Sequence, residues 1–162
     1  GPLLYLLHTS DIPTTPNTTI GTFADDTIIL ASHEDPTIAS SYVQSHLNLI
    51  QDWTNKWNIK INESKSTQVT FTLKKGSCPP VTVNNSIIPV SPSARYLGLH
   101  LDEKLTWKIH ILKKKKQIDL RLNDLNWLIG RKSRLSLENK ILVYKTIIRP
   151  IWTYGIELWG CA

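Results

Sequence analysis

The sequence lacks methionine, has only two cysteines and contains no apolar run long enough to cross a membrane. Without methionine it has no initiator residue, so we expect a fragment of a longer protein. Cys78 and Cys161 lie far apart and outside any CxxC or Cys/His spacing, which argues against a disulfide framework and a zinc site. The absence of a secretion or transmembrane signal predicts an intracellular protein, nuclear or cytoplasmic, that has no membrane partner.

Basic residues are absent from the first third of the chain. Residues 1–55 hold six acids and no Lys or Arg, whereas residues 56–162 hold all 19 basic residues and seven acids, so the two parts carry −6 and +12. An acidic end that can hold cations, joined to a basic end that can hold polyanions, suits a nucleic-acid enzyme. A basic face that only meets solvent is the alternative.

What is present favours a packed core, because 41% of the 162 residues are hydrophobic. The five histidines form no HExxH pair, and we interpret them as surface or partly buried residues. Hydrophobic periodicity and turn residues predict a small α+β layer over the first hundred residues. Its expected helices cover 3–7 and 36–57, and its expected strands cover 19–22, 27–31, 59–61, 69–73, 81–83, 87–88 and 96–101.

From residue 105 onward the periodicity is helical. One expected stripe ends at Gly130 and consists of Trp107, Ile111, Ile118, Leu122, Leu125 and Ile129. A second helix begins at the N-cap Ser136 and carries Leu137, Ile141, Tyr144 and Ile148 on one side. Pro150 is expected to end or kink it before a third helix at 152–159. Residues 104–149 hold 13 basic residues and three acids, which predicts a nucleic-acid surface.

Two adjacent carboxylates, Asp25 and Asp26, lie at the expected turn between the strands at 19–22 and 27–31. Such a pair repels itself, so it is costly unless a divalent cation or a basic partner neutralises it. Magnesium is the natural candidate and suggests phosphoryl or nucleotidyl transfer. Asp is also a common turn residue, so a purely structural turn remains the alternative.

Four motifs, in their order along the chain, resemble the reverse transcriptases of non-LTR retrotransposons, the jockey-like elements of insects in particular. The segment Phe23-Ala24-Asp25-Asp26-Thr27 is similar to the metal-binding hairpin of their palm. The others are Gly1 to Leu7 with Asp11-Ile12-Pro13, the Asn62-Glu63-Ser64-Lys65-Ser66-Thr67 segment, and Tyr96-Leu97-Gly98, which resembles the primer grip. The closing stretch from Tyr144 to Gly155 is similar to the thumb and connection helices.

The resemblance implies a fold, a reaction and a set of site residues. Residues 1–103 would be the C-terminal part of a palm, an antiparallel sheet with packed helices, and residues 104–162 an all-α thumb. Asp25 and Asp26 would bind two Mg²⁺ ions, Lys65 would protonate the leaving pyrophosphate, and Tyr96, Leu97 and Gly98 would hold the primer. An RNA template, a DNA primer and deoxynucleoside triphosphates would be the partners. The residues expected to grip phosphates are Lys113, Lys114, Lys115, Lys116, Arg121, Arg131, Lys132 and Arg134.

The resemblance also identifies what these 162 residues do not contain. The family's site needs a third carboxylate from an upstream strand, and nucleotide-binding fingers, so we expect the chain alone to be inactive. The sequence leaves open two alternatives to a polymerase fragment: a nucleic-acid-binding module without catalysis, and a decayed copy of an element.

Overall fold

The computed structural model describes Leu7 and residues 9–161. The expected helix at 3–7 and the Gly1-Pro2 motif therefore lie outside the described residues, apart from Leu7. The chain divides into two compact units, one up to Leu97 and one from Gly98, and each is treated by itself. The described strands form three two-stranded sheets, β1–β2, β3–β4 and β5–β6. Among the described helices, none has the length and hydropathy of a membrane span.

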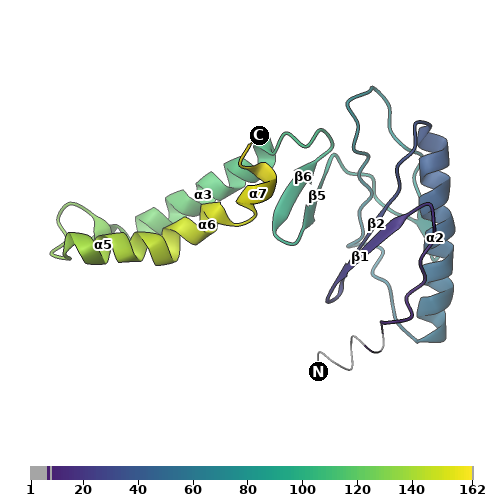
Figure 1. Cartoon of the computed structure of the whole chain (residues 1–162), viewed down its shortest axis with the longest axis horizontal. Coiled ribbons are helices and arrows are strands. Elements are labelled where there is room, and N and C mark those ends of the chain that lie inside the picture. Colours follow the sequence, from purple (N-terminus) through teal and green to yellow (C-terminus); the bar gives the residue numbers. More distant parts are fainter. Residues whose placement is uncertain (1–6, 8, 162) are drawn as a thin grey trace. The chain divides into compact units, whose positions relative to one another are not determined.

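The first two strands of the first unit form the β1–β2 hairpin (Figure 1). Strands β1 (Thr19–Phe23) and β2 (Asp26–Leu30) pair antiparallel, with Phe23 opposite Asp26. Only Ala24 and Asp25 remain to form the turn, and Ala24 takes a positive φ of 51°. A positive φ at the first central residue matches the primed turns that fit the twist of paired strands. The hairpin expected from the sequence is confirmed.

Helix α2 (Pro36–Lys56) is also confirmed, and Asp35 caps its start. The Asp35 side chain accepts a hydrogen bond from the Thr37 backbone N–H at 2.7 Å, and Pro36 occupies the first turn. One side of α2 packs against the β3–β4 hairpin, formed by Thr82–Val83 and Ser86–Ile87. Val81, Val83 and Ile88 make the core there, with Val43, Leu47 and Ile61 packed against it.

The expected strands at 59–61 and 69–73 are wrong. Within residues 57–80 the structure has a single bridge, between Gln68 and Val90, and no ladder. Backbone N–H groups here bond to side chains instead of a partner strand. Thr70 Oγ1 accepts from Cys78 N–H at 3.2 Å, and Thr72 Oγ1 accepts from Lys74 N–H at 3.1 Å. Alternating apolar residues become a strand only where a partner strand exists.

The expected single strand at 96–101 is also wrong. A turn at Leu97 and Gly98, with φ of 46° and 76°, separates β5 (Ser93–Tyr96) from β6 (Leu99–Asp102). Two successive positive φ values define a type I′ turn, which is easy for glycine and unfavourable for leucine. The Asn84-Asn85 turn, which joins the expected strands at 81–83 and 87–88, has the same pattern, with φ of 50° and 60°.

The second unit is mainly helical. Helix α3 (Lys108–Asp124) and the short α4 (Asn126–Ile129) follow β6. The expected stripe is partly right: Trp107 is buried and Ile118, Leu125 and Ile129 are half-buried, but Ile111 and Leu122 are exposed. The buried side follows Trp107 and His110, with Lys114 half-buried one turn further on, so a histidine takes the inward place expected for Ile111.

A continuous helical stretch returns alongside α3 (Figure 1). It comprises α5 (Leu137–Val143), the π-helical η1 (Tyr144–Ile148) and α6 (Arg149–Thr153), and it begins at the predicted N-cap Ser136. Pro150 does not end it. The turn before this proline is widened instead, with Arg149 N–H bonded to the Tyr144 carbonyl, and the wider turn accommodates the ring.

The widened turn also changes which residues face α3. Val143 is half-buried and Ile148 is buried, so the inward residues are five apart, whereas the expected stripe members Leu137, Ile141 and Tyr144 are exposed. The expected helix at 152–159 is broken as well. Thr153 ends α6, and α7 (Ile156–Trp159) starts after Gly155.

Candidate active site and basic surface

The Asp25 and Asp26 side chains are exposed at the tip of the β1–β2 hairpin. Neither forms an ion pair with any residue that the structure describes. No group of three ligating side chains is found in that part of the chain either. Carboxylate oxygens are hard donors that suit Mg²⁺, which proteins hold through one or two carboxylates together with substrate phosphates. The pair therefore fits the protein's share of a magnesium site and leaves the other ligands to be supplied.

A buried histidine fastens the segment that leads into β1. His46 of α2 has no exposed surface, and its Nε2 donates to the Pro13 carbonyl at 2.9 Å. Its Nδ1 is then the acceptor for the Thr18 hydroxyl at 2.5 Å, and Thr15 Oγ1 lies 2.5 Å from Thr18 Oγ1. The interpretation of all histidines as surface or partly buried is wrong for His46. This network fixes the start of the strand that ends at the acid pair.

Asp11 anchors the same segment two residues before Pro13. Its carboxylate accepts the indole N–H of Trp53 at 2.8 Å and of Trp57 at 3.2 Å, and Lys56 Nζ lies 3.7 Å away. The Trp53 hydrogen bond holds the pKa of Asp11 below its usual value, and the Trp57 hydrogen bond and the charge of Lys56 add to this effect. The tryptophan pair thus anchors the Asp11-Ile12-Pro13 motif to α2.

Lys65 lies exposed on a turn organised by Asn62. The Asn62 side chain accepts from Ser64 Oγ at 2.7 Å and from Lys65 N–H at 3.2 Å. Glu63 in turn accepts from the Asn84 side chain at 2.5 Å, which ties this turn to the β3–β4 hairpin. The Asn-x-x-Lys spacing therefore has a local cause: the asparagine builds the turn that displays the lysine.

The Tyr96-Leu97-Gly98 motif spans the end of the first unit and the start of the second. In the first unit, a methyl group on Gly21 of β1 would lie 3.8 Å from the Tyr96 hydroxyl, so this tyrosine reaches the β1–β2 hairpin. In the second unit, a methyl group on Gly98 would lie 3.4 Å from the Tyr154 ring. The structure describes no ion pair between Lys65 and either aspartate.

Gly155, near the C-terminus, is a second position where close packing requires a glycine. Gly155 has φ of 66°, and a methyl group there would lie 2.8 Å from Leu99 Cδ2. Tyr154, the preceding residue, also carries Lys114 Nζ over its ring at 5.0 Å from the centroid. The Thr153-Tyr154-Gly155 segment therefore docks on the start of β6, about 55 residues earlier in the sequence, and on α3, about 40 residues earlier.

The predicted phosphate-gripping residues differ in their surroundings. Four successive lysines point all around a helix, so they cannot share one face. Lys113 Nζ lies 3.3 Å from His100 Nδ1 and Lys114 stacks on Tyr154, whereas Lys115 and Lys116 are exposed. Arg121 pairs with Asp124 at 3.8 Å. Arg131, Lys132 and Arg134 are exposed in the loop after α4.

Sequence reasoning missed a histidine at the centre of the second unit. His110 has no exposed surface and lies among the rings of His100, Trp107 and Trp159, at centroid distances of 6.2, 6.0 and 5.5 Å. Burial lowers the pKa of His110, and the charge of Lys114 lowers it further. His110 is a polar residue on a basic helix, so the hydrophobic pattern of the sequence did not mark it as buried.

Residues 1–101 match the family described as "Reverse transcriptase (RNA-dependent DNA polymerase)". The chain belongs to the reverse transcriptase family. The resemblance drawn from the motifs is thereby confirmed, together with the enzyme class of the family. The mixed α/β class with small antiparallel sheets is confirmed too, while the palm and thumb boundaries at 1–103 and 104–162 stay predictions.

Curated relatives match over the whole chain. The RNA-directed DNA polymerase from mobile element jockey of Drosophila melanogaster is 38% identical, and the chain covers 19% of it. The probable RNA-directed DNA polymerase from transposon X-element of the same species is 36% identical, with 18% covered. The jockey polymerase of Drosophila funebris is 36% identical, with 19% covered. The chain thus spans about a fifth of the length of these relatives. No solved structure matches it.

Proposed function

We propose that the chain is the part of a non-LTR retrotransposon reverse transcriptase that carries two of its catalytic carboxylates. The observation that supports this most directly is the exposed Asp25-Asp26 pair, at the tip of a two-residue hairpin turn inside the segment that matches the family. The reaction is RNA-directed DNA synthesis, in which a primer 3′-hydroxyl attacks a deoxynucleoside triphosphate and pyrophosphate leaves. An intracellular setting, nuclear or cytoplasmic, stays a prediction.

The residues have separate parts in this proposal. Asp25 and Asp26 hold Mg²⁺, and a carboxylate outside these residues completes the site. When bound, the ions supply Lewis-acid stabilisation of the charge that develops on the phosphate oxygens. Lys65, displayed on its Asn62 turn, donates a proton to the leaving pyrophosphate. Tyr96, Leu97 and Gly98 position the primer terminus, and the lysines and arginines from Lys113 to Arg134 bind template and primer phosphates.

A chimaera tests the proposal, with these 162 residues replacing the matching stretch of the Drosophila melanogaster jockey polymerase. We expect magnesium-dependent primer extension on an RNA template, and a loss of at least about 100-fold with Asp25→Asn, because charge stabilisation in the transition state is lost. Asp52→Asn is the matched control, since Asp52 is an exposed aspartate on α2. Full extension by the Asp25 variant would refute the assignment.

The strong positive charge of residues 56–162 favours one other function, a nucleic-acid-binding module without catalysis. Binding by the chain and extension by the chimaera together separate the two. Template–primer binding with a steep salt dependence, combined with a chimaera that never extends a primer, supports the module.

A further inference from the structure

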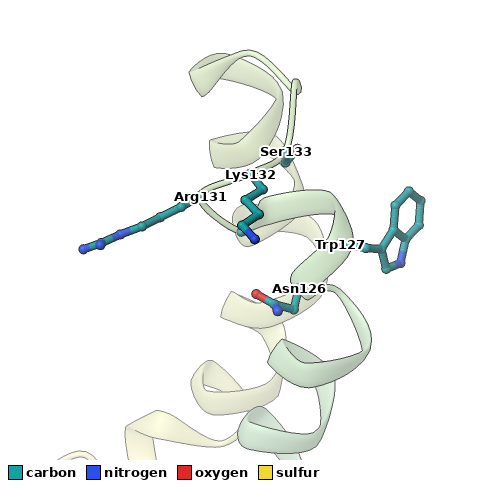
Figure 2. A pocket seen from close by; sticks show the side chains of 6 residues that line it. Asn126, Trp127, Arg131, Lys132 and Ser133 are labelled. Carbon is teal, nitrogen blue, oxygen red and sulfur yellow. The ribbon is translucent and has the colours of Figure 1, made fainter.

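In the second unit, the short helix α4 carries an exposed tryptophan next to a basic loop. Trp127 of α4 is 77% exposed, and it lines an open pocket of about 530 Å³ with Asn126, Gly130, Arg131, Lys132 and Ser133. Figure 2 shows its indole and the Arg131 side chain extending in opposite directions from the ribbon, with Lys132 and Asn126 between them. We propose that this tip binds single-stranded nucleic acid, with an unpaired base stacked on Trp127 and adjacent phosphates on Arg131 and Lys132.

The loop that presents the two cations is held in place. Lys140 Nζ donates to the Gly130 carbonyl at 3.2 Å and to the Ser133 carbonyl at 3.4 Å. The Ser133 hydroxyl donates to the Leu128 carbonyl and accepts from Leu135 N–H at 3.1 Å. One lysine is thus used to fix the loop, so that binding a ligand costs little further ordering of the backbone.

Charge points to a polyanion as the occupant. Residues 125–137 contain three basic residues and no acid. Arg131 and Lys132 make no ion pair with any residue in 9–161. Among the described residues that line the pocket, Trp127 is the only large apolar side chain, and its neighbours there are polar residues and glycine, unlike the apolar patch at a protein docking site.

The flat indole selects an unpaired base over a duplex. Aromatic side chains stack on any base whose face is free, whereas a base in a duplex must first leave its neighbours at a cost of a few kcal/mol. The inference rests on the proposed function and adds a contact for a single-stranded stretch, such as template beyond the duplex.

Two ligands with identical charge test the inference. Both are one duplex with a ten-nucleotide overhang, and in one of them the overhang is abasic. We expect the 162-residue chain to bind the base-bearing overhang roughly 5- to 100-fold more tightly, as stacking of one base predicts. Trp127→Ala removes this preference, and Trp127→Tyr keeps most of it. Leu120→Ala is the control, since Leu120 is an exposed apolar residue of α3.

Arg131→Gln separates charge from stacking. It is expected to weaken both ligands equally and to reduce the salt slope by about one. Equal affinity of the unaltered chain for the two overhangs, or the absence of any binding, overturns the inference. The inference is also overturned if Trp127→Ala leaves both affinities unchanged and alters only the oligomeric state in analytical ultracentrifugation, because the indole would then contact a second copy of the chain. The primer-extension result with Asp25→Asn is independent of all these outcomes.

Discussion

Replacing Asp102 with alanine removes the acceptor that holds the turn leading into α3. The carboxylate is only 9% exposed, and it accepts from Thr106 N–H at 3.0 Å, from Thr106 Oγ1 at 2.9 Å and from Trp107 N–H at 3.0 Å. The Trp107 donor is buried and would lose its partner, at a cost of about 1 to 3 kcal/mol. Thr106 is exposed, so water replaces its two bonds at little cost. We expect a loss of about 2 kcal/mol in the free energy of unfolding.

The assay is urea denaturation at pH 7, with unfolding monitored by tryptophan fluorescence. Glu103→Ala is the matched control, since the neighbouring Glu103 is exposed and accepts no comparable set of bonds. Asp102→Asn keeps one acceptor oxygen and should fall between the two. An Asp102→Ala variant that is no less stable than the Glu103→Ala variant would refute the reasoning.

The stability difference between the unaltered chain and Asp102→Ala should depend on pH with a definite sign. Burial by itself raises the pKa of Asp102, but the hydrogen bonds from Thr106 and Trp107 outweigh it and hold the pKa below the ordinary 3.8. A lowered pKa in the folded state means that the contribution is complete above about pH 4 and is lost as the pH falls through the folded value. The difference should therefore be constant between pH 7 and 5 and shrink in stronger acid.

Two further predictions concern the second unit. Because burial lowers the pKa of His110 below 6.5, stability should fall as the pH drops from 7 to 5, and His110→Phe should flatten that dependence in denaturation curves at several pH values. Gly155→Ala should destabilise the unit by about 1 to 3 kcal/mol in thermal unfolding, because a methyl group would meet Leu99 at a φ that alanine disfavours; an unchanged midpoint would contradict the close approach.

Local chemistry explains which parts of the fold could be predicted. The turns at Ala24-Asp25 and Asn84-Asn85, and the helix starts at Asp35 and Ser136, depend on residues within four positions of one another. Such signals are complete in a short window of sequence. The same holds for the candidate site as far as the hairpin tip and the Asn62 turn are concerned.

What failed depends on partners distant in sequence. The alternation at 69–73 predicts a strand only if another strand pairs with it, and Leu73 is instead 87% exposed. His46 is buried because Pro13 and Thr18 satisfy both ring nitrogens, and neither lies near it in sequence. Among the lysines, sequence could not tell that Lys114 stacks on Tyr154 while Lys115 faces solvent.

The widened turn before Pro150 makes residue counting matter in the last helix. Each residue advances a helix by about 100°, and η1 absorbs one more residue per turn than an ordinary turn holds. Deleting one residue between 144 and 147 would restore an ordinary turn and place the inward-facing Val143 and Ile148 four apart, which is still one face of an α-helix. The proline would then lie in an ordinary turn, where its ring meets the carbonyl four residues before it. The extra residue therefore lets a proline stand within the helix while the residues on both sides of it keep facing α3.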